Sequence, residues 1–275
     1  MVLYVKRAGI IRQVYVKIYT HILHIVQERG AAFFVLIDPD KSQAKKLRTF
    51  AERSAELGVD ALLVGSSLLM NDAFEKTVKL VKSSTDIPVI LFPGSPNQVS
   101  HYADAILFLS LISGRNPNFL FGDHVIAAPA IKEIAIEPIP TGYMLIESGG
   151  VSTTEYISNT RPIPREKPEI AVAHALAAEF LGLRMLYLEA GSGAPRTVPN
   201  EMIAAVRRKC GLPIIVGGGI TKPETAGEKV QSGADIIVVG NALENKWDEA
   251  VVKAFSDAVH SARSKNSKCS RKTKK

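Results

Sequence analysis

Cysteine is nearly absent from this chain of 275 residues, which contains only Cys210 and Cys269. Two cysteines so far apart provide neither a zinc-finger spacing nor a disulfide framework. A chain of this length can bury a substantial core, so it needs neither disulfides nor a structural metal to fold. The scarcity of cysteine therefore indicates a reducing compartment, and the predicted location is the cytoplasm.

Long hydrophobic runs are also missing. The longest apolar stretches, such as residues 31–37, stop well short of the roughly 18 residues that a membrane-spanning helix requires. Near the N-terminus an apolar run follows Lys6 and Arg7, but Arg12 and Lys17 interrupt it. Residues 8–29 are therefore predicted to form an amphipathic helix rather than a signal peptide.

Acidic residues are absent from the last thirteen positions, which carry seven lysines and arginines. These seven charges equal the formal net charge of +7, so residues 1–262 are neutral overall. We expect residues 1–262 to form the folded domain and residues 263–275 a basic, disordered tail. A solvated tail is the simplest interpretation, and peripheral contact with an anionic membrane is the alternative. Nucleic acid is not an expected partner, because only the tail suggests it.

Eight short, continuously apolar segments are typical of strands buried on both faces of a parallel sheet. They are residues 33–38, 61–65, 89–92, 105–109, 143–147, 185–189, 214–217 and 236–240. Helical patterns lie between most of them, at residues 43–57, 73–83, 168–181, 200–210, 224–232 and 244–261. Repeated β/α units in this number predict an α/β fold, a single (β/α)8 TIM barrel with an extra N-terminal helix.

The third unit of this pattern is irregular. The segment between Phe92 and Ala105 is short and is interrupted by glycine and proline, so a regular helix is not expected there. The barrel is therefore predicted to have a missing or vestigial third helix. Residues 149–168, which contain three prolines, are predicted to form a long loop after strand five.

Glycine-rich turns follow the last two predicted strands. Strand seven ends in Gly217, Gly218 and Gly219, and strand eight ends in Gly240 and Asn241. Catalytic groups of TIM barrels lie at the carboxyl ends of the strands, and the loops after strands seven and eight commonly hold phosphate. One interpretation is that these glycines only permit tight turns. Two glycine-rich turns at adjacent strands instead favour a phosphate site.

A carboxylate marks the end of strand six, where Glu189 precedes the loop of Gly191, Ser192 and Gly193. Glu189 could accept hydrogen bonds from substrate hydroxyls or take a proton from one. Ser192 and the loop amides could hold phosphate oxygens. The alternative is that Glu189 only forms a salt bridge inside the barrel mouth.

Oxygen ligands follow strands one and two, where Asp38 precedes Pro39 and where Ser66 and Ser67 follow Gly65. Magnesium prefers such hard ligands, completed by water and substrate phosphates, although Asp-Pro is also a common turn sequence. This half-site is expected to lie far around the rim from the phosphate turns. Two phosphorylated substrates would then face each other across the barrel mouth.

The segments IDPDK, VGSS, YLEAGSGAP, GGGI and VGNAL, in this order and spacing, resemble the geranylgeranylglyceryl phosphate synthase family, which includes bacterial heptaprenylglyceryl phosphate synthases. The resemblance covers residues 33–243. It implies a magnesium-dependent prenyltransferase that joins sn-glycerol 1-phosphate to geranylgeranyl diphosphate and releases diphosphate. The product would carry the first ether bond of archaeal-type membrane lipids.

The resemblance also implies roles for individual residues. Asp38 and Ser67 would coordinate Mg2+ on the diphosphate, and Glu189 would bind the glycerol hydroxyls. The remaining residues of the glycerol phosphate pocket would be Tyr187, Leu188, Ala190, Gly191, Ser192, Gly193, Gly218, Gly219, Gly240 and Asn241. Family members lack a regular third helix, which leaves a groove for the prenyl chain, and they form dimers or hexamers.

One departure from the family pattern is Leu36, which stands where the shorter bacterial branch has a lysine, two positions before the metal aspartate. Together with the AGSG loop, it indicates the longer branch associated with the archaeal reaction. Two other functions stay open at this point: a phosphosugar isomerase or epimerase on the same barrel, and a catalytically silent lipid- or phosphate-binding protein. The six histidines show no metal-ligand spacing and are expected to pack or lie at the surface.

Overall fold

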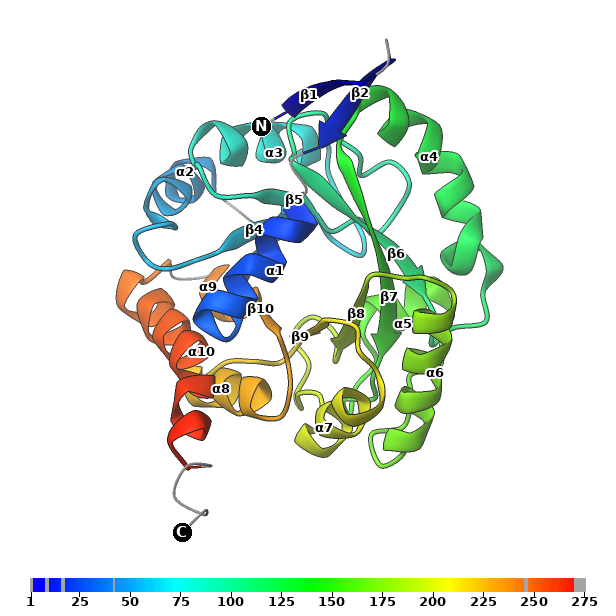
Figure 1. Ribbon diagram of the computed structural model, residues 1–275, viewed down its shortest axis with the longest axis vertical. Helices are drawn as coiled ribbons and strands as arrows, with labels where there is room; N and C mark the ends of the chain where they lie inside the picture. Colours follow the sequence, from blue (N-terminus) through cyan, green and yellow to red (C-terminus); the bar gives the residue numbers. More distant parts are fainter. Residues whose placement is uncertain (1, 8–9, 16–17, 42, 245–246, 270–275) are drawn as a thin grey trace.

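The chain folds into a closed barrel of eight parallel strands surrounded by helices, as the computed structural model shows (Figure 1). The structure describes residues 2–7, 10–15, 18–41, 43–244 and 247–269. The barrel strands are β3 (Ala32–Ile37), β4 (Ala61–Val64), β5 (Val89–Leu91), β6 (Ala105–Leu111), β7 (Glu137–Leu145), β8 (Met185–Glu189), β9 (Ile214–Gly217) and β10 (Ile236–Val239). The barrel closes because β10 pairs with β3, which confirms the predicted TIM barrel.

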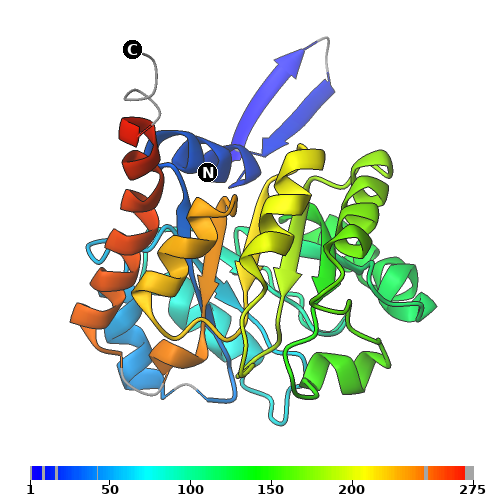
Figure 2. The same cartoon turned by 90° about the horizontal axis from the view of Figure 1, so that it is seen from below.

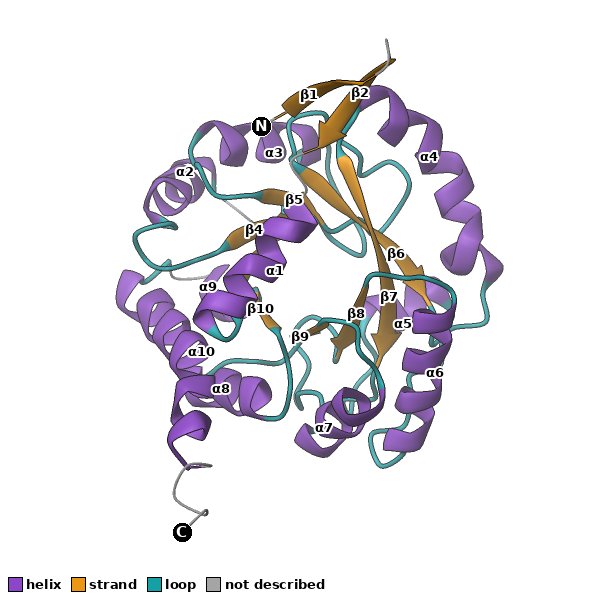
Figure 3. Cartoon of the chain, viewed as in Figure 1, coloured by secondary structure: helices purple, strands orange, loops and turns teal. Residues whose placement is uncertain are grey.

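Helices surround the barrel, and the first of them lies across its amino end (Figure 3). They are α1 (Ile18–Arg29), α2 (Ala44–Arg53), α3 (Phe74–Ser83), the π-helix η1 (Asn118–Gly122), α4 (Asp123–Ile134), α5 (Thr153–Ser158), α6 (Pro168–Phe180), α7 (Asn200–Lys209), α8 (Pro223–Gln231), α9 (Asn241–Glu244) and α10 (Glu249–Cys269). None of the helices in the described ranges is long and apolar enough to span a lipid bilayer.

The core has two layers because successive side chains of a strand point to opposite faces. Phe34, Leu63 and Ile90 belong to a cluster that fills the barrel interior. Phe33, Leu62 and Leu91, their neighbours along the same strands, belong to the cluster packed between the strands and the surrounding helices. Both faces of each strand are therefore buried, as the continuously apolar segments predict.

Three aspartates form hydrogen bonds and ion pairs at the amino ends of the strands. Asp60, Asp104 and Asp235 each precede a strand directly and accept the first free N–H of the neighbouring strand, at 2.7, 2.8 and 2.9 Å. Arg29 and His260 bind Asp60, Lys82 binds Asp104, and Arg207 and Arg263 bind Asp235. This end of the barrel is thus closed by charge-assisted hydrogen bonds.

The N-terminal segment differs from its prediction. Instead of one helix over residues 8–29, the described residues form the antiparallel hairpin of β1 (Val2–Arg7) and β2 (Ile10–Tyr15), followed by α1. Residues 8–9 and 16–17 lie outside the described ranges. The β-branched and aromatic residues of Ile10–Tyr15 favour a strand, which the amphipathic pattern concealed. Figure 2 shows the hairpin, α1 and the end of α10 at the same end of the barrel.

The missing third helix is confirmed, since residues 92–104 connect β5 to β6 without a helix. Three other connections were not predicted correctly. Helix α4 was not predicted because it contains Pro129. Strand β7 begins at Glu137, but its start was predicted at residue 143, because Pro138 and Pro140 are unusual in strands. The predicted loop 149–168 contains the short helix α5.

Helix α10 extends past residue 263, where the basic tail was predicted to begin. Helix α10 continues to Cys269, and Arg263 donates hydrogen bonds to Ala234 and Asp235 at 3.1 and 2.9 Å. Residue 263 therefore belongs to the folded domain, because its guanidinium has a buried carboxylate as a partner. Residues 270–275 of the predicted tail lie outside the described ranges.

Candidate active site

A polar pocket, the mouth pocket, opens at the carboxyl ends of the strands. The predicted site residues that line it are Asp38, Ser67, Tyr187, Glu189, Ser192, Gly193, Gly218, Gly219, Gly240 and Asn241. They come from five strand ends that are scattered over two hundred residues of sequence. The barrel fold brings them together because parallel strands all end at the same rim.

The turn after β9 approaches its neighbours so closely that only glycine fits. A Cβ at Gly218 would lie 2.3 Å from Glu189 Oε1 and 2.7 Å from the amide nitrogen of Gly191. A Cβ at Gly219 would lie 2.7 Å from the carbonyl oxygen of Ala194. Both glycines have positive φ, at +83° and +70°, which L-residues rarely adopt. The β9 turn and the loop after β8 therefore form two adjoining walls of the pocket.

Glu189 is the buried carboxylate of the mouth pocket, with 6% of its surface exposed. Burial raises its pKa to about 7, and the hydrogen bond that the Gly191 N–H donates to Oε1 at 2.9 Å opposes this effect. Glu189 therefore changes protonation near neutral pH, where a general base works best. The salt-bridge alternative is not what the structure shows, because no ion pair of Glu189 occurs among the described residues.

Aromatic rings surround this carboxylate. Tyr187 stacks on Phe92 with ring centroids 5.2 Å apart, and Tyr143 lies 5.4 Å from Tyr187. The Tyr187 hydroxyl is buried beside this carboxylate, and its hydrogen bond to Glu189 lowers the pKa of the carboxyl group.

Three predicted pocket residues contribute no lining side chain. Leu188 points away from the mouth into the outer core, because it alternates with Tyr187 along β8. Ala190 packs in the same outer cluster, and Gly191 contributes through its amide. The structure therefore leaves these three residues only backbone roles.

The predicted distance between the metal half-site and the phosphate turns is wrong. Asp38 follows β3, which is paired with β10, so its loop lies beside the turn that carries Asn241. Lys41 joins the two sides: its Nζ lies 2.9 Å from Asp38 Oδ2 and 3.5 Å from Asn241 Oδ1. Asn241 Oδ1 also accepts a hydrogen bond from Ser192 Oγ at 3.2 Å. The physical reason is barrel closure, which makes the first and last strands neighbours.

The oxygen atoms near Asp38 suit a metal ion that takes most ligands from a substrate. No cluster of three histidine, cysteine or acidic side chains that could hold a metal occurs among the described residues. Ser66 Oγ lies 3.5 Å from Asp38 Oδ2, and Oδ1 of Asp40 is buried without a hydrogen-bond partner among the described residues. One or two carboxylates of this kind, completed by phosphate oxygens and water, match the preference of Mg2+.

Ser67 lies at the junction between the mouth pocket and a second cavity. Its hydroxyl is 2.9 Å from the Thr154 hydroxyl of α5, which ties the loop after β4 to the loop after β7. Ser67, Phe92, Tyr143 and Thr154 line both cavities. The two cavities therefore meet at these four residues.

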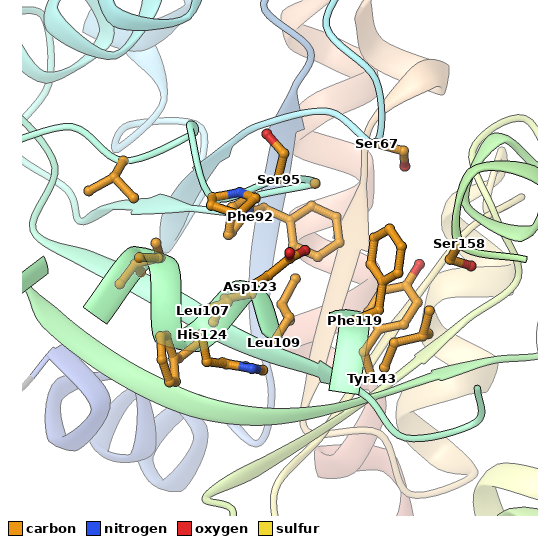
Figure 4. A pocket seen from close by; sticks show the side chains of 18 of the residues that line it. Ser67, Phe92, Ser95, Leu107, Leu109, Phe119, Asp123, His124, Tyr143 and Ser158 are labelled. Atoms are coloured by element: carbon orange, nitrogen blue, oxygen red, sulfur yellow. The ribbon is translucent and has the colours of Figure 1, made fainter. Parts of the chain in front are cut away.

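The second cavity is an apolar groove with about 850 Å³ of empty volume. It lies where the third helix is missing, between residues 92–99 and helix α4. Figure 4 shows Phe92, Leu109, Phe119 and Tyr143 around it. Asp123 and His124 also line it, and burial raises the pKa of Asp123 and lowers that of His124. Most of the other lining side chains are apolar, so the groove suits a long hydrocarbon.

The mouth pocket and the groove can be compared with known proteins. The model of the PcrB family matches residues 23–259, which span the whole barrel. This chain belongs to the PcrB family. Two PcrB relatives are geranylgeranylglyceryl phosphate synthases. The one from Spirosoma linguale is 50% identical over 83% of this chain and 94% of its own length, and that from Thermococcus gammatolerans is 47% identical over 81% and 88%.

Solved structures agree with this family assignment. The (S)-3-O-geranylgeranylglyceryl phosphate synthase from Thermoplasma acidophilum, in complex with its substrate sn-glycerol 1-phosphate, superposes with a TM-score of 0.84 at 32% identity. The alignment covers 89% of this chain and 98% of that one. A thiamine phosphate pyrophosphorylase from Pyrococcus furiosus, at 16% identity and a TM-score of 0.55, shares the fold alone.

Sequence reasoning missed four residues of the site. Asp40 and Lys41 stood within the DPDK segment but received no role, Tyr143 was counted only as part of a strand, and Thr154 lay in a predicted loop. The motif position could have revealed Lys41. No sequence signal marks Thr154, because its place at the junction depends on how the loop after β7 folds back.

Proposed function

We propose that this protein is a geranylgeranylglyceryl phosphate synthase. It transfers the geranylgeranyl group from its diphosphate to the C3 hydroxyl of sn-glycerol 1-phosphate and releases diphosphate. The observation that supports this most strongly is the junction of the polar mouth pocket, which contains Glu189, with an apolar groove. A reaction between a small polar phosphate and a long hydrocarbon needs these two cavities to meet.

The glycerol phosphate occupies the side of the mouth pocket formed by β8, β9 and β10. Its phosphate is bound by the amides after these strands and by Ser192 and Asn241. Gly191, Gly193, Gly218, Gly219 and Gly240 allow the backbone to approach the phosphate closely. Tyr187 and Glu189 bind the glycerol hydroxyls. The Thermoplasma acidophilum relative was solved in complex with sn-glycerol 1-phosphate, which supports the choice of this substrate.

The prenyl diphosphate occupies the other side, with its chain in the apolar groove and its diphosphate near Asp38 and Ser67. These residues, with Asp40, would hold Mg2+ together with the diphosphate oxygens. When bound, Mg2+ neutralises charge on the leaving diphosphate. To hold Mg2+, the Ser67 hydroxyl would have to give up its hydrogen bond with Thr154.

Glu189 accepts the proton of the C3 hydroxyl as its oxygen attacks C1 of the prenyl chain. One carbon–oxygen bond forms at C1 while the bond from C1 to the diphosphate oxygen breaks, and the proton moves to Glu189. Positioning both substrates contributes much of the rate, since productive alignment of two reactants is worth about 7–11 kcal/mol. The raised pKa of Glu189 suits it to take this proton.

An enantiomer assay tests this function. The protein is incubated with Mg2+, geranylgeranyl diphosphate and either sn-glycerol 1-phosphate or sn-glycerol 3-phosphate, and the ether product is measured by mass spectrometry. We expect product almost only from the 1-phosphate, because fixed amides and one carboxylate present one hydroxyl to C1. Comparable turnover of both enantiomers would contradict the assignment, and prenyl diphosphates of other lengths define the chain preference.

Two further parts of the proposal concern the protein's surroundings. It acts in the cytoplasm as a homo-oligomer, a dimer or a hexamer, and takes its lipid substrate from the membrane surface.

A phosphosugar isomerase is less well supported as the function, because a sugar phosphate has no hydrocarbon chain to fill a groove lined by Phe92, Leu109 and Phe119.

A further inference from the structure

The charge of the mouth pocket is unfavourable for the two substrates of the proposed reaction. Its described lining contains three carboxylates, those of Asp38, Asp40 and Glu189, and a single lysine or arginine, Lys41. Both substrates of the proposed function carry phosphate groups, and they must lie close enough to react. Their negative charges repel each other and the carboxylates, so a cation placed between them is valuable.

Lys41 has the required position. Its Nζ bridges Asp38, on the side of the diphosphate, and Asn241, on the side of the glycerol phosphate, at 2.9 and 3.5 Å. The bridge is possible because β3 and β10 are neighbours in the closed barrel. The lysine side chain is 49% exposed within the mouth. Its ammonium group is therefore accessible to a bound ligand and has three donors to share among oxygen atoms.

We propose that Lys41 is a substrate-binding residue that contacts the phosphates of both substrates and reduces the repulsion between them. This inference rests on the proposed function. The backbone amides of the glycine turns bind one phosphate and the oxygens near Asp38 serve the other, whereas Lys41 lies between the two. Its loss therefore affects the ability of the two anions to bind together more than the binding of either anion alone.

A simpler role for Lys41 is to orient Asp38 through their ion pair. In that case, loss of the lysine alters only the diphosphate side. The two roles differ in thermodynamic coupling, which is the factor by which one ligand changes the affinity for the other. This factor can be measured without turnover.

Calorimetry with sn-glycerol 1-phosphate, at fixed Mg2+ and with or without inorganic pyrophosphate, measures the coupling. In the wild type we expect pyrophosphate to change the Kd of glycerol phosphate less than about twofold. In Lys41→Met we expect pyrophosphate to weaken glycerol phosphate binding by about five- to tenfold, within the usual range of coupling between sites. Lys41→Arg keeps the charge and should restore most of the wild-type behaviour.

Lys45→Met is the matched control, since Lys45 is an exposed lysine of α2 that does not line the mouth pocket. It should behave like the wild type. The inference is overturned if pyrophosphate changes the Kd of glycerol phosphate in Lys41→Met no more than in the wild type. This holds even if Lys41→Met binds pyrophosphate itself more weakly, because that result would fit a role in orienting Asp38. A wild type that fails to bind sn-glycerol 1-phosphate would instead overturn the proposed function.

Discussion

Glu189 combines two properties that a polar residue rarely has together: it is almost fully buried, and no ion pair of it occurs in the part of the chain that the structure describes. Burial raises its pKa to about 7, so the folded protein binds this proton more tightly than the unfolded chain does. The associated stability is fully present below pH 4.5 and is lost as the pH rises through 7. The loss amounts to about 3 kcal/mol, so the ionised form of Glu189 is present at the expense of stability.

Glu189→Gln tests this role at the residue scale. The amide keeps the size of the side chain but cannot take a proton, and a charged hydrogen bond of about 1.5–3 kcal/mol is lost. We expect kcat/KM for glycerol phosphate to fall about ten- to a hundredfold. In the wild type, kcat/KM should rise with pH through about 7, as Glu189 loses its proton. In the variant this rise should disappear, which pH–rate profiles would show.

Asp38→Asn is the comparison variant, because Asp38 lies on the other side of the mouth pocket. It should raise the Mg2+ requirement while the Kd for glycerol phosphate changes little. A variant at Glu189 that shifted the Mg2+ requirement, together with one at Asp38 that weakened glycerol phosphate, would mean that the two substrates occupy the opposite sides.

At the scale of elements, the loop between β8 and α7 is held by cations from other segments. Lys229 of α8 is buried and donates to the carbonyl oxygen of Val198 at 2.8 Å and to Asn200 Oδ1 at 2.7 Å. Arg165 donates to the carbonyl oxygen of Thr197 at 3.2 Å. Lys229 thus fixes the end of the loop that contains Gly191, Ser192 and Gly193. Burial lowers its pKa, which shows that the position is costly for a charge.

Lys229→Met should therefore raise the KM for glycerol phosphate about tenfold, because a displaced loop presents its amides poorly. The KM for the prenyl diphosphate should stay within about twofold of the wild type, since the site proposed for that substrate lies on the other side of the mouth. Thermal unfolding should show a stability loss of about 1.5–3 kcal/mol. Steady-state kinetics with each substrate varied in turn measures the difference.

Lys82→Met provides the control for stability. Lys82 binds Asp104 at 2.7 Å, at the opposite end of the barrel. This variant also loses a charged hydrogen bond, but both KM values should remain unchanged. If it raised the KM for glycerol phosphate as much as Lys229→Met does, the effect would be a general consequence of destabilisation.

At the scale of the whole molecule, α10 is attached to the end of the barrel that lies away from the active site. Phe255 and Val259 are fully buried, and His260 and Arg263 bind Asp60 and Asp235. Since these aspartates precede strands, the helix leaves the barrel at the amino ends. A membrane that faced the mouth pocket would therefore lie on the opposite side from Arg263.

Two truncations test this arrangement. Removal of residues 264–275 should leave turnover of a soluble short-chain prenyl diphosphate unchanged, because the described lining of the mouth pocket and of the groove ends at Ala242. Removal of residue 263 as well takes away the partner of Asp235 and should lower the free energy of unfolding by about 1.5–3 kcal/mol. Denaturant titration compares the two. If the two truncated proteins had the same free energy of unfolding, Arg263 would contribute nothing to stability. If removal of residues 264–275 abolished turnover, these residues would belong to the active site.

The strand pattern and the motifs could be derived from the sequence because they depend on local signals. Seven of the eight predicted strands agree with the observed ones within two residues at each end. Glycines, a carboxylate and a serine at strand ends indicated the rim of the barrel. The N-terminal hairpin, α4 and the start of β7 were missed, because prolines and mixed periodicities give conflicting local signals there.

Taken by itself, the sequence determined which residues reach the rim, since parallel strands end on one side and glycines permit close turns. Only the tertiary structure decided which of them are neighbours. Barrel closure sets β3 beside β10, so Lys41 joins Asp38 to Asn241, although 200 residues separate Lys41 from Asn241. The fold also buries Glu189, which sets its pKa, and it brings Thr154 to Ser67 where the groove begins. Each of these depends on contacts between distant segments, which no local pattern encodes.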